Sequence, residues 1–257
     1  MNADQESPEP GAHVTRVFDD ILSPMAFMRP ETLQPSGWQE HIPFAFWLID
    51  RAMPRVFVEL GTLSGNSYLA FCQAVKALEL PTRCYAVDTW QGDAHTGSYG
   101  DDVYWALVNY HDCRYASFSR LLRTTFDGAL EHFDDGSIDL LHIDGLHTYE
   151  AMRYDFESWR PKLSSRAVVL FHDTNVRERG FGGTKLWTEL VDAYPHNFQF
   201  LHCCGLGVLG VGTDLPVAVG KFFAAARTAD GTRLIRDVYG RLGTHCTATA
   251  VQQLPQP

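Results

Sequence analysis

Acidic residues follow directly after several short apolar runs in this 257-residue chain. Glu59 and Asp88 end two of these runs, Asp144 ends another within IDGLHTYE, and Asp173 follows one within LFHDT. A single acid after a strand is an ordinary turn residue. Four acids placed in this way indicate a shared site instead. Carboxylates gathered at one site can bind hydroxyl groups, hold a divalent cation or orient a basic side chain.

Three histidines accompany these acids. His147 lies three residues after Asp144, and we expect it to be a general base, with an exposed histidine at a helix start as the alternative. His142 lies inside an apolar run, and we expect it to be a core residue. His172 precedes Asp173 directly, and both a role in the site and a packing role are left open for it.

The stretch VELGTLSGNS at residues 58–67 is an apolar run that breaks into small residues and continues at helical spacing. Such a turn lets backbone N–H groups approach a polar ligand closely, which predicts a nucleotide-like cofactor. Asp88 ends the following strand, where an acid can accept hydrogen bonds from ribose hydroxyls. Leu63 stands where the dinucleotide fingerprint G-x-G-x-x-G requires glycine, which disfavours a dinucleotide. The turn also lacks the pattern of a phosphate-binding loop.

Apolar runs alternate with helical patterns along the chain, which predicts a parallel sheet with helices on both faces. The expected fold class is α/β: a doubly wound, mostly parallel, seven-stranded Rossmann-like sheet with a C-terminal antiparallel hairpin. The carboxyl ends of its strands then form one rim, where ligands bind. We expect strands at residues 56–60, 83–88, 118–123, 138–144, 167–172, 198–202 and 206–211, and helices at 38–53, 67–80, 101–113, 127–133, 148–160 and 184–194.

Composition narrows the class of protein further. The chain is 45% hydrophobic with a net charge of −10, which favours a globular domain and argues against a nucleic-acid surface. No apolar stretch reaches membrane-span length, no signal peptide is recognisable, and no CxxC pair occurs. We therefore expect a cytoplasmic protein.

We expect disorder at 1–13 and 247–257 around one domain at 14–246, made of a helical cap (14–55), a core sheet (56–212) and C-terminal helices (213–246).

Four blocks, in this order and spacing, resemble class I S-adenosylmethionine-dependent methyltransferases. The match is to the branch of macrocin-type sugar O-methyltransferases and cephalosporin-hydroxylase-like proteins. The blocks are VELGTLSGNS at 58–67, AVDTWQGD at 86–93, IDLLHIDGLHTYEAMRYDFESW at 138–159 and VVLFHDT at 168–174. The resemblance implies an S-adenosylmethionine-dependent O-methyltransferase that acts on a hydroxyl group of a small molecule, with a sugar or glycan as the expected acceptor.

The resemblance also implies roles for particular residues. Residues of the first turn would bind the methionine part of the cofactor, Asp88 its ribose, and the residues after the third strand its adenine. A divalent cation, usually magnesium, would lie between Asp144 and Asp173, with His172 as a further ligand where the branch often has an acid. The cofactor residues expected on this basis are Glu59, Gly61, Thr62, Ser64, Gly65, Ser67, Asp88, Thr125, Phe126 and Asp144, and the expected catalytic residues are His147, Asp144 and Asp173.

Two alternatives belong to other functional classes. One is an NAD-dependent oxidoreductase of similar fold, which the acid at Asp88 favours and the missing glycine pattern disfavours. The other is a non-catalytic binding module that keeps the fold. The sequence does not identify the acceptor, and it leaves open whether the protein is a homo-oligomer. The aromatic residues of the N-terminal region, such as Trp38 and Phe44, could cover the acceptor pocket or form a dimer contact.

Overall fold

The structure of the protein is a computed structural model, and it describes residues 18–178 and 180–251. The described residues form a seven-stranded sheet with the strand order β5-β2-β1-β6-β7-β9-β8. Within this part of the chain β9 is the strand that runs against the others, because it pairs antiparallel with both β7 and β8. The strands are β1 (Val56–Leu60), β2 (Arg83–Asp88), β5 (Ser119–Arg123), β6 (Ile138–Ile143), β7 (Leu163–His172), β8 (Asn197–Phe200) and β9 (Leu206–Gly210).

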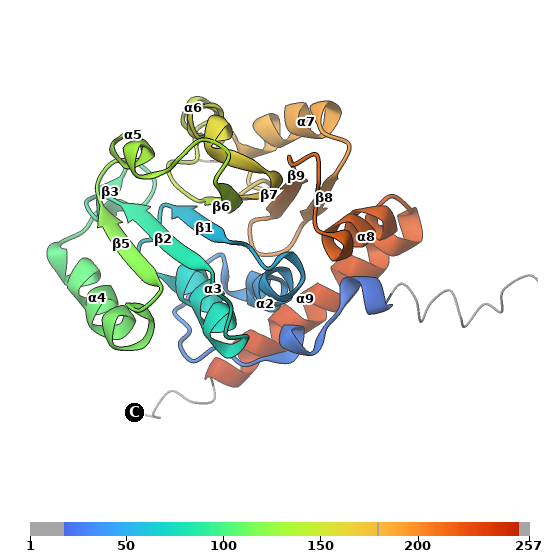
Figure 1. The fold of residues 1–257 in the computed structure, drawn as a ribbon, viewed down its shortest axis with the longest axis horizontal. Helices are drawn as coiled ribbons and strands as arrows, with labels where there is room; N and C mark the ends of the chain where they lie inside the picture. The colour runs from blue at the N-terminus through green and yellow to red at the C-terminus, as the bar shows by residue number, and fades with distance from the viewer. Residues whose placement is uncertain (1–17, 179, 252–257) are drawn as a thin grey trace, which may run out of the picture.

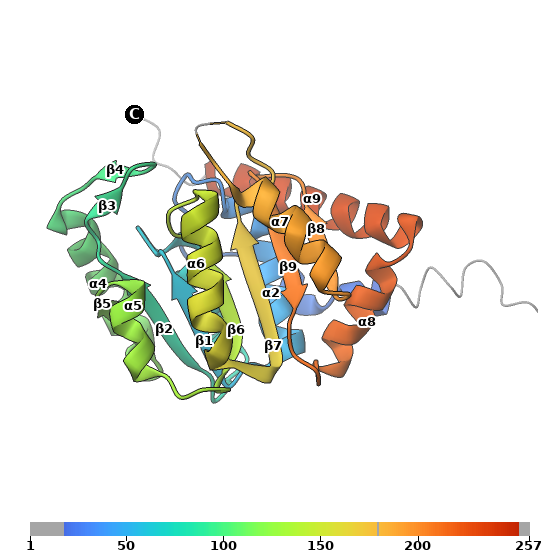
Figure 2. The same ribbon diagram turned by 90° about the horizontal axis from the view of Figure 1, so that it is seen from above.

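Helices cover both faces of this sheet (Figures 1 and 2). One layer contains α5 (Phe126–Ala129), α6 (Tyr149–Trp159) and α7 (Gly183–Ala193). The other layer contains α2 (Ile42–Ala52), α3 (Asn66–Ala77), α4 (Asp101–Tyr115), α8 (Val217–Ala226) and α9 (Ala229–Val251). This is the Rossmann-like, doubly wound architecture that the alternating pattern predicts, and the C-terminal antiparallel hairpin is confirmed.

Side chains alternate between the two helical layers along each strand. In β1, Phe57 packs with α2 and α3, whereas Val58 and Leu60 pack with residues of α6 and α7. Glu59 therefore shares a face with Phe57, and the parallel register sets it directly beside His142 of β6. This alternation decides which polar groups of the rim meet α3 and the N-terminal segment.

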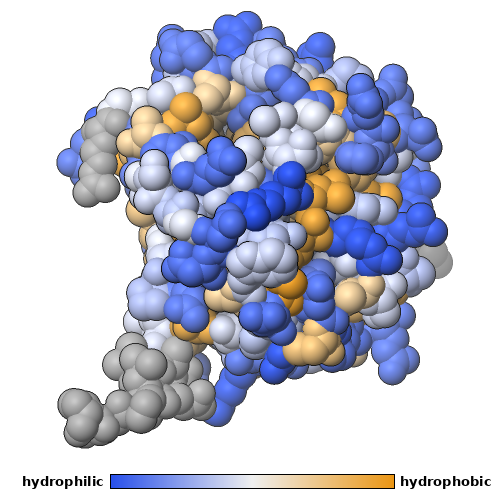
Figure 3. Space-filling view, turned by 90° about the vertical axis from the view of Figure 1, so that its left-hand side faces the viewer, coloured by the Kyte–Doolittle hydropathy of each residue, from blue (hydrophilic) through white to orange (hydrophobic). Residues whose placement is uncertain are grey.

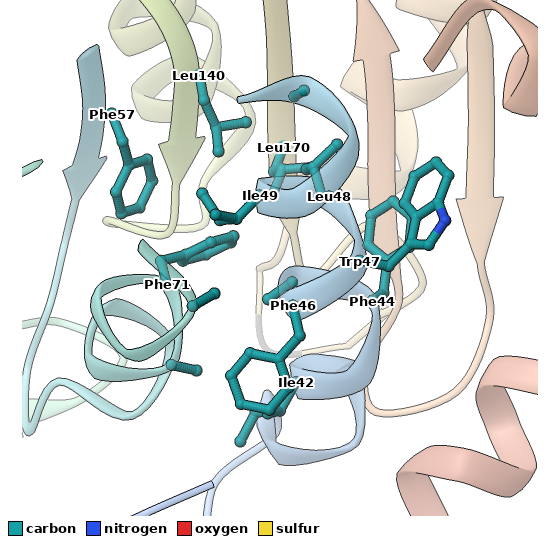
Figure 4. Packing of buried hydrophobic residues seen from close by; sticks show 14 of the residues in the cluster. Ile42, Phe44, Phe46, Trp47, Leu48, Ile49, Phe57, Phe71, Leu140 and Leu170 are labelled. Atoms are coloured by element: carbon teal, nitrogen blue, oxygen red, sulfur yellow. The ribbon is translucent and has the colours of Figure 1, made fainter. Parts of the chain in front are cut away.

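The first eight residues of α2 are apolar on all sides and are buried between the sheet and the C-terminal helices. Each residue from Ile42 to Ile49 is buried, as expected for a helix without a polar face. Figure 4 shows Ile49 near Leu140 and Leu170 of the sheet. The N-terminal region is thus part of the core, which fixes the segment just before α2 over the rim.

The structure moves several expected boundaries. The long loop after β2 contains a small two-stranded ribbon of β3 (Gly92–Asp93) and β4 (Gly97–Ser98). The helix expected at 127–133 is α5 followed by a 3-10 turn, η3 (Leu130–His132), and β7 begins four residues earlier than expected because Leu163 pairs with Ile138 across a bulge. The expectation of disorder from residue 247 onward is wrong up to Val251, where α9 ends. The stretch expected to be disordered at 1–13 lies outside the described residues.

The surface near α4 is mostly hydrophilic. Figure 3 shows the side of the molecule where α4 and the edge strand β5 lie, with hydrophobic residues exposed in narrow areas between hydrophilic ones. Across the described residues, no helix is both long enough and apolar enough to cross a membrane.

Candidate active site

The turn after β1 lies tightly against the end of β6. Gly61 adopts φ +86°, and a Cβ atom placed on it would lie 2.3 Å from the backbone oxygen of Asp144. Its N–H donates to the Val87 carbonyl at 3.0 Å. Only glycine fits this position, because an L residue is strained there and the neighbouring backbone cannot yield. The turn is thereby held between the ends of β2 and β6.

Asp88 fastens this turn to the loop that follows β2. Its Oδ2 accepts from the backbone N–H groups of Thr62 and Leu63 at 2.8 and 2.9 Å, and its Oδ1 accepts from Trp90 N–H at 2.8 Å. A carboxylate has about four acceptor positions, so Asp88 retains capacity for a ligand. The sequence indicated the ligand-binding role of Asp88 but gave no sign of this structural one.

Two pockets meet at the turn. The larger has a volume of about 860 Å³ and the smaller about 250 Å³, and Gly61, Leu63, Thr96 and Asp144 line both. The smaller pocket is lined by the residues expected near ribose and adenine, Asp88, Thr125 and Phe126. The larger is lined by Thr62, Ser64, Ser67, Asp144, His147, His172 and Asp173 among others. Nearly all expected site residues therefore line one or both of two adjoining pockets.

Two expected cofactor residues line neither pocket. Gly65 begins α3 with φ +84°, and a Cβ atom on it would lie 2.5 Å from Leu107. Residue 65 is therefore a glycine because of its left-handed backbone and the close packing of α4. Glu59 is fully buried behind the turn. Its Oε2 is 2.8 Å from Nδ1 of His142, whereas Oε1 has no hydrogen-bond partner among the described residues.

Asp144, His147 and Asp173 converge at the ends of β6 and β7. Nε2 of His147 lies 3.0 Å from Oδ2 of Asp173 and 3.9 Å from Oδ1 of Asp144. One ligand atom from each residue lies within 4.8 Å of the other two. Asp173 adopts φ 58°, the left-handed region, which turns its carboxylate back toward His147. This cluster can bind a proton or a divalent cation.

His172 contacts Asp144 and the N-terminal segment. Its Nδ1 lies 3.0 Å from Oδ1 of Asp144, and its Nε2 lies 3.1 Å from the Gly37 carbonyl oxygen. Both partners accept hydrogen bonds, so both nitrogens donate and the ring is an imidazolium. Burial lowers the pKa of His172, but the charge of Asp144 outweighs it and raises the pKa to about 9. In this state His172 positions Asp144. The cluster of possible ligand atoms among the described residues consists of Asp144, His147 and Asp173, and the metal-ligand role expected for His172 stays a prediction.

The other ionisable groups of the cluster respond to the same charges. Burial alone would raise the pKa of Asp144, but the neighbouring His172 lowers it. Burial would lower the pKa of His147, but the hydrogen bond with Asp173 and the charge of Asp144 raise it. Asp144 thus favours the charged forms of both histidines, and His172 favours the charged form of Asp144.

Two loops close over His147. The Phe181 ring stacks on His147 at 5.0 Å and on His95 at 4.4 Å between centroids. His95 belongs to the ribbon after β2, where Asp93 Oδ1 accepts from its N–H at 2.7 Å. The Gly182 N–H donates to the His147 carbonyl at 2.7 Å. The loop after β7 and the ribbon after β2 therefore meet above the candidate base.

The segment before α2 forms another wall of the larger pocket. The Asn66 side chain, at the start of α3, accepts from Gln34 N–H at 3.1 Å and donates to Ser36 Oγ at 2.7 Å. Ser36, Gly37 and Trp38 line the pocket. We call residues 31–38 the N-terminal strap. The aromatic residues of this region indicated a cover for the site, but no sequence signal identified the Asn66 contacts.

Comparison with known proteins agrees with this geometry. Residues 58–174 match the model of a methyltransferase domain. Over 222 residues the chain is 50% identical to the uncharacterized protein y4gI of Sinorhizobium fredii, a match that covers 86% of this chain and 24% of that protein. The chain therefore spans about a quarter of the length of this curated relative.

Solved structures show the same fold at low identity. One is the O-methyltransferase TomG of Streptomyces achromogenes in complex with S-adenosylmethionine, with a TM-score of 0.51, 14% identity, and coverage of 80% of this chain and 91% of TomG. Another is cofactor-bound Rv0187 from MTB, with a TM-score of 0.51, 14% identity, and coverage of 82% and 94%.

The solved structures and the strand order agree on a Rossmann-like methyltransferase fold for this chain. The match to a methyltransferase-domain model extends over residues 58–174, slightly less than half of the chain.

Proposed function

We propose that this protein is an S-adenosylmethionine-dependent O-methyltransferase that modifies a hydroxyl group of a small molecule, with a sugar or glycan as the acceptor class. The observation that carries the proposal is the junction of the two pockets at Gly61 and Asp144. The smaller space suits an adenosine bounded by Asp88 and Phe126. The larger space has the acid–histidine cluster at its wall and room for a methionine group and an acceptor.

The residues present fit this cofactor. Gly61 lets the cofactor turn pack directly against the Asp144 backbone, and it lines both pockets. Oγ1 of Thr62 is buried without a hydrogen-bond partner in the described chain, and Thr62 lines the larger pocket. Leu63 adopts φ 49° and lines both pockets, where a dinucleotide would need bare backbone for its pyrophosphate. This disfavours the oxidoreductase alternative.

His147 is the residue placed to take the proton of the acceptor. S-adenosylmethionine supplies a methyl group on a positively charged sulfur, and a hydroxyl that accepts this group must lose its proton. Nε2 of His147 lies 3.0 Å from Oδ2 of Asp173, so the neutral ring carries its proton on Nε2 and donates it in a hydrogen bond to this carboxylate. The nitrogen left to accept a proton is Nδ1, which has no hydrogen-bond partner in the described residues. Asp173 stabilises the imidazolium that forms, and Asp144 is held in place by His172. Most of the remaining rate enhancement is expected from positioning.

Asp144, His147 and Asp173 are also the residues that would hold a divalent cation. A bound cation would lower the pKa of the acceptor hydroxyl. Two carboxylates and one imidazole suit a transition-metal ion better than magnesium, which prefers oxygen ligands. Methyl transfer that is fully retained in metal-free, chelator-treated protein would assign the cluster to proton transfer alone. Activity restored only by an added cation would assign it to metal binding.

Calorimetric titration with S-adenosylmethionine and S-adenosylhomocysteine tests the cofactor directly. We expect both to bind and NADH not to bind. Transfer of a labelled methyl group to a panel of sugars and glycosides, compared with catechols, tests the acceptor class. The proposal fails if neither adenosyl compound binds.

A further inference from the structure

A buried chain of hydrogen bonds connects the N-terminal strap to Glu59. Nε1 of Trp38 lies 3.1 Å from Nε2 of His142, and Nδ1 of His142 lies 2.8 Å from Oε2 of Glu59. Trp38 is 2% exposed, and the other two side chains are fully buried. Trp38 also lines the larger pocket, so the chain reaches from the wall of the candidate acceptor space to the acid behind the cofactor turn.

The fold fixes each member of this chain independently. Glu59 and His142 are direct partners in the parallel register of β1 and β6, and they point to the same face of the sheet. The Trp38 ring packs edge-on against His142 at 5.4 Å and against Phe71 of α3 at 5.5 Å. Rigid packing of this kind keeps the donor and acceptor atoms aligned.

The chemistry of the three groups determines where the proton of His142 lies. An indole N–H can only donate a hydrogen bond, so Nε2 of His142 must accept. A neutral imidazole then carries its proton on Nδ1, and that N–H donates to Oε2 of Glu59. Glu59 therefore receives one directed hydrogen bond from His142. The Ser67 side chain, which lines the larger pocket, also interacts with Glu59.

We propose that Trp38 and His142 are positioning residues that orient Glu59 beneath the cofactor turn, where Glu59 supports Ser67, a pocket-lining residue expected at the methionine end of the cofactor. This inference rests on the proposed function for its cofactor and adds two residues that act through Glu59. It also makes the N-terminal strap part of the cofactor site, because the strap supplies the N–H donor. Gly37 of the strap binds His172 through its carbonyl oxygen, so a seated strap sets both Glu59 and Asp144.

Nitrogen NMR of the histidine-labelled protein tests the proton position without any ligand. We expect the ¹⁵N shifts of His142 to show a neutral ring protonated on Nδ1, with His142→Gln providing the assignment. Trp38→Phe keeps an aromatic ring but removes the N–H donor to Nε2 of His142. In this variant His142 should no longer be held with its proton on Nδ1. A wild-type His142 protonated on Nε2 would overturn the proposal.

Calorimetry with S-adenosylhomocysteine tests the consequence for binding. We expect Trp38→Phe and His142→Gln to weaken binding roughly tenfold, the usual scale for losing a residue that orients a ligand-binding group. The matched control is Trp159→Phe, since the Trp159 side chain is fully buried and its Nε1 has no hydrogen-bond partner in the described residues. The control should bind as the wild type does.

The outcomes separate this inference from the proposed function. Failure of the wild-type protein to bind S-adenosylhomocysteine would overturn the proposed function, and the NMR result would still decide the placement of the proton. Wild-type affinity in folded Trp38→Phe and His142→Gln variants would overturn the positioning role while leaving the proposed function intact. Thermal unfolding identifies any variant that loses affinity because it fails to fold.

Discussion

Gly61 is the residue whose backbone the site depends on most directly. Its backbone is left-handed, and a Cβ atom placed there would lie 2.3 Å from the Asp144 carbonyl oxygen, which leaves no room for a side chain. Alanine there would push β1 away from β6 at the junction of the two pockets. Glycine is therefore required at residue 61 by a steric clash in addition to its left-handed backbone, and the two effects can be measured separately.

We expect Gly61→Ala to lower the free energy of unfolding by roughly 2–4 kcal/mol, from left-handed strain plus overpacking. Gly136→Ala is the matched control, because Gly136 adopts φ +69° with no atom of the described chain within 4 Å of a Cβ. Gly136→Ala should lower the free energy of unfolding by only about 1–2 kcal/mol, from left-handed strain. Urea unfolding measures both, and equal losses would argue against the steric explanation.

His147 is the residue that the proposed chemistry depends on most. We expect His147→Ala to reduce methyl transfer by about 10²–10⁴-fold, the range for loss of a general base, while S-adenosylhomocysteine binding is retained. Product formation from labelled S-adenosylmethionine and calorimetry measure the two effects. Retained activity would contradict a catalytic role, and a matching loss of binding would place His147 in the cofactor site.

At the scale of elements, the ribbon of β3 and β4 is held by one side chain. Oδ1 of Asp93 accepts from His95 N–H at 2.7 Å, from Thr96 N–H at 2.8 Å and from Thr96 Oγ1 at 3.1 Å. Burial raises the pKa of Asp93, but these hydrogen bonds outweigh it and the pKa is lowered. The ribbon covers His147 through His95 and Phe181. Disorder of the ribbon would therefore uncover the expected acceptor site.

We expect Asp93→Ala to weaken this ribbon locally by about 1–3 kcal/mol, the scale of losing hydrogen bonds to a charged group. Amide hydrogen exchange should then accelerate at residues 92–98 and leave the sheet unchanged. The control is Asp230→Ala on α9, an exposed acid that pairs with Arg233. Unchanged exchange in the ribbon would show that its stability comes from elsewhere.

At the scale of the whole molecule, the pH dependence of stability includes a buried acid near Gly145, a residue that lines the smaller pocket. Asp155 of α6 is buried. Burial, together with the charge of Asp127, raises the pKa of Asp155 to about 7. Since its unfolded pKa is near 3.9, the folded state binds the extra proton between these values. Stability is therefore greatest below about pH 4 for this group and falls as pH rises through 7.

We expect Asp155→Asn to remove this loss, which is about 4 kcal/mol over the full range between the two pKa values. Urea unfolding from pH 5 to 8 should show a flatter pH dependence in the variant than in the wild type. Glu157→Gln on the same helix is the control, because Glu157 is exposed and pairs with Arg153. Parallel curves for the wild type and Asp155→Asn would contradict the raised pKa.

Local pattern was sufficient to predict much of this protein. Apolar runs of strand length, helical spacing between them and glycine at the turn are patterns within a few residues. They predict the order of strands and helices along the chain. They also place the acids Asp144 and Asp173 at one rim of the sheet. Element ends were less predictable. β7 begins at Leu163 because of its pairing with Ile138, which local pattern does not report.

Tertiary structure decided how the polar groups are paired. The bond between Trp38 and His142 joins residues 104 positions apart, and the approach of His172 to Gly37 depends on where the N-terminal strap crosses the rim. The sequence by itself determined which residues reach the carboxyl edge of the sheet, because strand and turn preferences are local. Which of them donate, accept or stay unpaired follows from side chains brought together across the fold, and only the packed structure fixes those contacts.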